Sequence, residues 1–204
     1  MVTLSPLAIA VGLIALTVLV GVVVTVMRSR HTARLRDRFG DEYDRTIDQS
    51  GSMYEAETVL HEREQRVAAF DIRPLEPARR EAFVRAWLEV QAQFVDDPAG
   101  AVQRADVLLA DVMTARGYPV ADFDQRYEDL SVDHGEVVAH YRTGHHIAAS
   151  HARGEAGTEE LRRAMSHYRA LFDDLVNEPE NFSPVIEHRG GRIHDLRKET
   201  TRRS

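Results

Sequence analysis

An uncharged stretch of 24 residues near the N-terminus limits what this part of the chain can fold into. It runs from Leu4 to Met27 and reads LSPLAIAVGLIALTVLVGVVVTVM. A helix rises about 1.5 Å per residue, so this stretch is long enough to cross a hydrocarbon core of about 30 Å. The sequence therefore predicts a transmembrane anchor with a basic flank over residues 1–30.

A cleaved signal peptide is the competing interpretation of the same stretch. Signal peptides place a basic residue before an apolar run of about 7–15 residues and end at a small-x-small cleavage site. Here no Lys or Arg precedes Leu4, the apolar run is longer, and no such site precedes Arg28. These features favour an anchor that stays on the protein.

Basic residues follow the apolar stretch directly and predict its orientation. Five arginines lie between residues 28 and 38, against a single acidic residue, Asp37. The arginines are Arg28, Arg30, Arg34, Arg36 and Arg38. Because basic flanks stay on the cytoplasmic side, we expect a single-pass protein of the cell membrane. Its N-terminus would lie outside and its C-terminal domain in the cytoplasm. The same arginines are expected to contact anionic lipids, at about 1 kcal/mol each.

Residues 31–74 are dominated by charge. A short polar helix is expected around Arg38–Thr46, and Ser52 with Glu55 forms a capping box that begins another helix. The apolar residues of that second helix make no clean stripe, which predicts a charged helical stalk, solvated or packed along one edge. The break at Ile72–Leu75 then marks the expected start of the domain.

Residues 75–176 carry the clearest helical periodicity. Phe83, Trp87, Val90 and Phe94 recur on one helical face, and Asp97-Pro98 can begin the next helix. No segment alternates as strands do. We therefore expect an all-α protein in which this part forms a four- to five-helix bundle-like domain.

Further stop and start signals divide the second half of this domain. Gly117 is expected to end a helix, and Ser131 to cap a helix with Asp133 in its first turn. Thr158 is expected to cap the last helix. Residues 177–204 are rich in Pro, Gly, Ser and Arg without periodicity, which predicts a disordered tail.

Four phrases of the sequence resemble one family. They are RFGDEYDRT (Arg38–Thr46), FVDDPAGAV (from Phe94), RGYPV (Arg116–Val120) and SVDHGEVV (from Ser131). They resemble an uncharacterised family of bacterial membrane-anchored or "secreted" helical proteins. The resemblance covers roughly residues 34–176 and implies one continuous domain with an anchor. The family has no assigned activity, so the resemblance implies no role for any residue.

Composition excludes several classes of function. The chain has no cysteine, which excludes disulfides, thiolate metal sites and thiol nucleophiles. Residues 76–176 contain 18 acidic residues against 11 arginines. Nucleic-acid binding needs clustered cations, so no nucleic-acid partner is expected for this domain.

Histidines concentrate in the second half of the chain. Six lie between residues 134 and 167, namely His134, His140, His145, His146, His151 and His167. A helical zinc site places ligands three or four residues apart, whereas His140–His145 and His146–His151 are both spaced by five. We therefore expect no metal site and no cofactor.

An acid–base site is the alternative use of these side chains. His134, Tyr141, His145 and His167 would supply it if they converged, as in a hydrolase or a metal-dependent enzyme using the region 134–167. The sequence contains no nucleophile motif and no phosphate-binding loop. It therefore favours a membrane-anchored protein-interaction module, whose partner is another protein, over an enzyme.

Overall fold

The protein is all-α. The computed structural model describes residues 6–119 and 121–177, with side chains described from residue 14 onwards, and contains no strand in these ranges. The helices are α1 (Pro6–Phe39), α2 (Asp41–Ser50), α3 (Met53–Val67), α4 (Pro77–Gln93), α5 (Pro98–Arg116), α6 (Phe123–Asp133), α7 (Val138–Ala152) and α8 (Thr158–Asn177). The part after residue 75 therefore has five helices, α4 to α8. The tail predicted to be disordered lies outside the described residues, except for Asn177, which ends α8.

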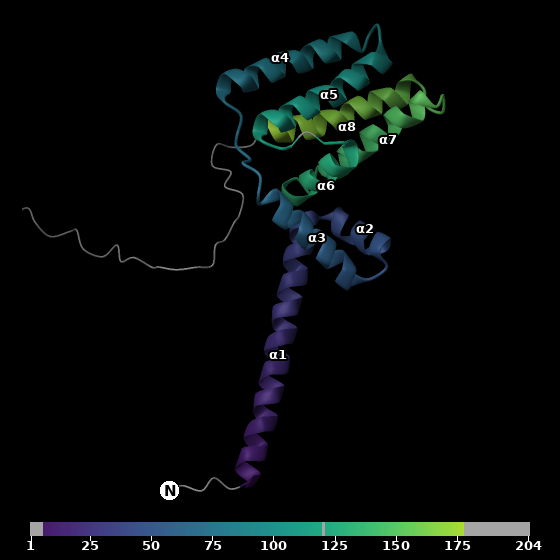
Figure 1. Cartoon of the computed structure of the whole chain (residues 1–204). Helices are drawn as coiled ribbons and strands as arrows, with labels where there is room; N and C mark the ends of the chain where they lie inside the picture. Colours follow the sequence, from purple (N-terminus) through teal and green to yellow (C-terminus); the bar gives the residue numbers. More distant parts are fainter. Residues whose placement is uncertain (1–5, 120, 178–204) are drawn as a thin grey trace, which may run out of the picture.

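Helix α1 is continuous from the apolar stretch into the folded domain. Its apolar side chains from Ile14 to Met27 are exposed, whereas Leu35 and Phe39 near its end are fully buried. Figure 1 shows the first part projecting from the rest of the molecule as a single rod. Among the described residues, α1 is the one helix long and apolar enough to cross a membrane.

Several helix boundaries follow the local signals in the sequence. The Ser52 hydroxyl accepts the backbone N–H of Glu55 at 3.2 Å, and the Asp97 carboxylate accepts that of Gly100 at 2.9 Å. These contacts satisfy N–H groups that have no partner inside the helix. Gly117 ends α5 in the left-handed conformation, with φ of 102°, which costs a glycine little.

The expected helix from Ser131 onwards is wrong. Ser131 and Asp133 belong to the end of α6, and α7 begins only at Val138. Asp133 is therefore not a first-turn residue, and its carboxylate pairs with Arg38 at 2.8 Å. The chain turns here because Gly135 lies against the end of α1, where an added Cβ would come within 2.5 Å of the Arg38 carbonyl oxygen.

Helices α4, α5, α7 and α8 pack on one another, with α8 in contact with the other three. Figure 1 shows α5, α7 and α8 gathered together, with α4 on the far side from α1. The apolar stripe predicted for α4 contributes Trp87 to the core, and α5 and α8 contribute Leu109 and Phe172 among others. Trp87 stacks on Phe172 with ring centroids 4.6 Å apart. Gly144 allows α7 to approach α8, because its missing Cβ would lie 2.7 Å from the Tyr168 ring.

Residues 31–74 are packed more extensively than a solvated stalk would be. Leu35, Phe39, Tyr43, Leu60 and Val67 are buried in the same hydrophobic cluster as the core of the later helices. Helices α2 and α3 form a hairpin, and both α1 and α3 contact α6. The side chains of α2 and α3 that face α6 include charged ones, which is why these helices lack a purely apolar stripe.

Candidate functional site

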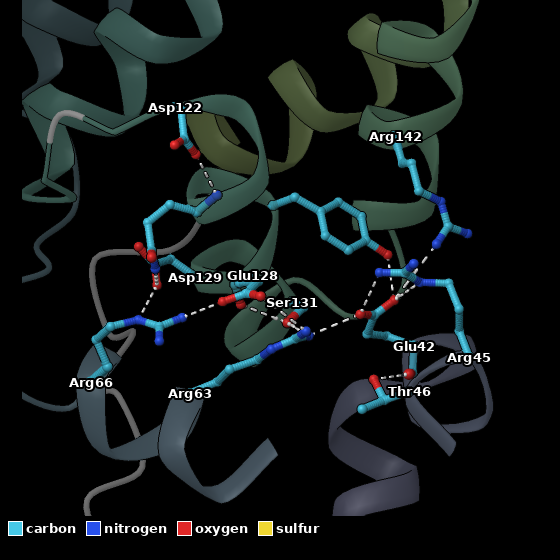
Figure 2. A network of polar contacts seen from close by, with 12 residues as sticks. Glu42, Arg45, Thr46, Arg63, Arg66, Asp122, Glu128, Asp129, Ser131 and Arg142 are labelled. Carbon is cyan, nitrogen blue, oxygen red and sulfur yellow. Dashed lines mark hydrogen bonds and ion pairs between the residues drawn. The ribbon is translucent and has the colours of Figure 1, made fainter. Parts of the chain in front are cut away.

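The junction between the α2–α3 hairpin and the later helices is built around a buried carboxylate, Glu42 of α2 (Figure 2). Arg45 donates to it from Nε at 2.7 Å and from Nη2 at 2.9 Å. Arg63 of α3 donates from Nη1 at 2.8 Å, and the Tyr127 hydroxyl of α6 donates as well. Arg142 of α7 lies 3.9 Å away. One carboxylate thus binds groups from α2, α3, α6 and α7. We call Glu42, Arg45, Arg63, Tyr127 and Arg142 the Glu42 cluster.

A second set of ion pairs extends the same junction along α3 and α6. Arg66 donates to the Asp129 carboxylate at 2.9 Å and to Glu128 at 2.8 Å. Gln125 also donates to Asp129, at 2.9 Å, and Asp122 caps the start of α6 through the Gln125 N–H. Figure 2 shows these groups side by side with the Glu42 cluster. The Arg66 contacts hold the end of α3 against α6.

The electrostatics of Glu42 favour its ionised form. Burial by itself would raise the pKa of the Glu42 carboxyl, but hydrogen bonds from Arg45, Tyr127 and Arg63 outweigh that cost and lower the pKa below 4.5. Burial, together with the Glu42 carboxylate, raises the pKa of the Tyr127 hydroxyl to about 12. The hydroxyl therefore stays a donor and the carboxylate an acceptor at neutral pH.

Arg38 joins the end of α1 to this junction. Its guanidinium donates to Glu64 of α3 at 2.9 Å, to Asp133 of α6 at 2.8 Å, and to the Val132 carbonyl at 2.9 Å. Three donors of one planar group thus bind two helices at once. Helix α1 is fixed to the domain by these hydrogen bonds as well as by the buried Leu35 and Phe39.

A cleft of about 440 Å³ lies beside Arg38. It is bordered by Arg34 and Asp37 of α1, by the turn 134–137 and by Asp174 of α8. His134 lies in its wall, where Nδ1 is 2.5 Å from the Asp174 carboxylate and Nε2 is 3.2 Å from the Tyr118 hydroxyl. Both ring nitrogens of His134 thus have partners within the protein.

The Asp174–His134–Tyr118 chain is suited to holding the fold rather than to attacking a substrate. The His134 side chain is buried, and the Tyr118 hydroxyl is buried behind it. Burial raises the pKa of the Tyr118 hydroxyl well above its ordinary value, so it does not supply a phenolate at neutral pH. These three hydrogen-bonded side chains link the segment just after α5, the turn before α7 and the end of α8.

The other residues predicted for an acid–base site lie in two further places. Tyr141 and His145 of α7 pack on Phe123, whose ring is 4.9 Å from that of Tyr141 and 3.6 Å from that of His145. Burial raises the pKa of Tyr141 and lowers that of His145. His167 of α8 instead pairs with His140, Nδ1 to Nδ1 at 2.9 Å. Only Tyr141 and His145 of the four share an aromatic neighbour.

The described residues contain no group of three or more His, Asp or Glu side chains arranged to hold a metal ion. The residues that the structure gathers most densely are instead Glu42, Arg63 and Tyr127, which the sequence did not single out. One signal in the sequence could have found them. Ala56, Leu60 and Val67 share one face of α3 with Arg63, and an arginine within an otherwise apolar stripe indicates a buried charge that needs a partner.

The chain matches no protein-family model, no curated protein and no solved structure. The assignment of the candidate site therefore rests on the geometry described above.

Proposed function

We propose that this chain is a membrane-tethered interaction module that holds a helical domain in a fixed position at the membrane surface. The observation that carries the proposal is the continuity of α1. One helix exposes apolar side chains from Ile14 to Met27 and then buries Leu35 and Phe39 in the domain. A flexible linker would let the domain rotate freely, whereas a continuous helix transmits the orientation of the span to the domain.

The proposed orientation follows from the basic flank. Arg28, Arg30 and Arg34 lie directly after the apolar stretch, so the positive-inside rule favours a domain on the cytoplasmic side of the cell membrane. These arginines would also lie at the level of the lipid headgroups and contact anionic lipids there.

The proposed partner is another protein, bound at the outer face of α4 and α5. Helix α4 exposes Val84 and Leu88 one turn apart, and Val107 of α5 is exposed as well; the exposed fraction of Leu88 is 58%. Val107 also lines a groove between the two helices, together with Val90 and Leu108. Exposed apolar side chains next to one another, such as Val84 and Leu88, are typical of protein-binding surfaces. Figure 1 shows α4 on the side of the domain away from α1, where a partner would not meet the membrane.

Photocrosslinking in the native membrane tests the proposed surface. A benzophenone amino acid would replace Leu88, and, as a matched control, Arg153 at the exposed end of α7. We expect a discrete crosslinked product from the Leu88 position and none from the Arg153 position. Identical products from both positions, or none from either, would contradict the proposed binding face.

A further inference from the structure

The tip of the α2–α3 hairpin carries two exposed apolar side chains. Met53 and Tyr54 begin α3, and their exposed fractions are 52% and 71%. The turn before them is tightly formed, because Gly51 ends α2 in the left-handed conformation and Ser52 caps α3. The exposed pair is therefore held in place by the hairpin and does not lie on a loose loop.

A hydrogen bond sets the position of this tip along the anchor helix. Thr32 of α1 donates to the Glu57 carboxylate of α3 at 2.7 Å, and the Tyr43 hydroxyl donates to the same oxygen at 3.2 Å. Glu57 is thus level with Thr32. Figure 1 shows α3 running obliquely from the top of α1 down toward its first residues, which lie to the side of α1.

The lengths of the two helices then place the tip near the end of the apolar stretch. Met53 precedes Glu57 by one helical turn, which lowers it by up to about 6 Å toward the apolar segment. Met27, the last residue of that segment, lies about 7.5 Å below Thr32 on α1. The tip is therefore level with the part of the basic flank between Arg28 and Thr32.

From this geometry we propose that Met53 and Tyr54 form a second membrane contact, which inserts into the interfacial layer beside the anchor. The inference builds on the proposed membrane span of α1. Tyrosine suits this layer because its ring is apolar and its hydroxyl is polar, and methionine adds flexible apolar surface. Two points of contact would fix the tilt and the rotation of the domain relative to the membrane, which a single span does not.

The charges around the tip indicate which kind of lipid interaction it can make. Asp48 and Glu55 flank Met53 and Tyr54, whereas Arg28 and Arg30 face the same layer from α1. The acidic pair opposes attraction to anionic headgroups, so the contact rests on interfacial insertion of the two apolar side chains rather than on headgroup charge.

Depth measurements by site-directed spin labelling test this contact on the full chain. The protein has no native cysteine, so single substitutions can be labelled without background. Met53→Cys reports on the tip, Val20→Cys on the span and Leu88→Cys on the face proposed to bind a partner protein, away from the membrane. Each labelled protein is reconstituted into vesicles of phosphatidylcholine and phosphatidylglycerol. Depth is then read from collision with oxygen, which enriches in lipid, against collision with a water-soluble nickel chelate.

We expect the Val20 label to be deep, the Met53 label to be shallow but within the lipid, and the Leu88 label to be aqueous. Adding Tyr54→Asp should move the Met53 label toward the aqueous value, because a carboxylate is expelled from the interface. This second variant changes an exposed side chain, so the fold should persist.

The possible failures separate the two proposals. A deep Val20 label with a Met53 label as aqueous as Leu88 would overturn the second contact and leave the span intact. Aqueous values at both Val20 and Met53 would overturn the span and the contact together. Equal lipid exposure at Met53 and Leu88, or no effect of Tyr54→Asp, would also contradict a specific contact at the hairpin tip.

Discussion

Glu42 and Arg63 form an ion pair at 2.8 Å, in which the two side chains are only 1% and 6% exposed. The pair joins α2 to α3, and through Tyr127 it also joins both helices to α6. Burying a charge costs free energy, because water no longer solvates it. The Glu42 carboxylate and the Arg63 guanidinium offset part of this cost for each other. Helices α2 and α3 are thus attached to α6 by buried polar contacts of Glu42.

Removing the charge of Glu42 should strongly destabilise the protein. Glu42→Gln leaves Arg63 with only the half-exposed and more distant Glu128 carboxylate, at 3.4 Å, as a counter-charge. We expect a loss of about 3–5 kcal/mol in the free energy of unfolding. Asp173→Asn is the matched control, because it removes one carboxylate from the half-exposed Arg169–Asp173 pair. The control should cost less than about 1 kcal/mol. Thermal melts of the full chain in detergent would measure both. Equal losses would show that the burial of Glu42 has no energetic consequence.

Lowering the pH should remove the stabilisation that the ionised Glu42 carboxylate provides. The pKa of Glu42 is lowered below 4.5 in the folded protein, so the unfolded chain takes up its proton first as pH falls. The stabilisation is therefore complete above pH 4.5 and is lost as the pH falls through the lower, folded-state pKa. The difference in Tm between wild type and Glu42→Gln should be constant near neutral pH and shrink below 4.5. A difference that is independent of pH would contradict this account.

Gly135 should be intolerant of a side chain. An added Cβ would lie 2.5 Å from the Arg38 carbonyl oxygen and 3.0 Å from the Phe39 carbonyl carbon, both backbone atoms that cannot move aside easily. We expect Gly135→Ala to cost about 1–3 kcal/mol, the usual range for overpacking. Gly21→Ala is the control, because nothing lies within 4 Å of the added Cβ there. Melting both variants beside wild type tests the contact, and an unchanged Tm for Gly135→Ala would refute it.

The segment 31–74 should contribute to the stability of the later helices. A fragment of residues 75–177 lacks Arg63 and Arg66, which leaves the buried Asp129 carboxylate without its arginine partner. We expect a fragment of residues 31–177 to melt cooperatively and the shorter fragment to melt at a lower temperature. Equal melting temperatures would instead support an independent domain that begins at Leu75.

Local signals in the sequence predict much of this fold. The all-α class and the single apolar N-terminal helix are confirmed. The stripe that contains Trp87 and the caps at Ser52 and Asp97 depend only on residues close together in the chain, and so they could be read from the sequence.

Features set by distant contacts could not be predicted in this way. The turn at Gly135 exists because α1 passes against it, and a local pattern contains no information about that approach. The position of Arg63 among Ala56, Leu60 and Val67 indicates a buried charge, but its partner Glu42 lies 21 residues earlier in the chain and is identified only by the fold. The role of His134 could not be predicted for the same reason, since its partners are Tyr118, just after α5, and Asp174 of α8.

The membrane span of α1 and the side on which the domain lies are the central claim, and cysteine accessibility tests them most directly. Val95→Cys places a thiol at an exposed position of the domain, and Thr3→Cys places one before the apolar stretch. Cells that express each variant are treated with a membrane-impermeant maleimide before and after permeabilisation. We expect Thr3→Cys to be labelled in intact cells and Val95→Cys to be labelled only after permeabilisation. Labelling of Val95→Cys in intact cells, or protection of both positions until permeabilisation, would contradict the account.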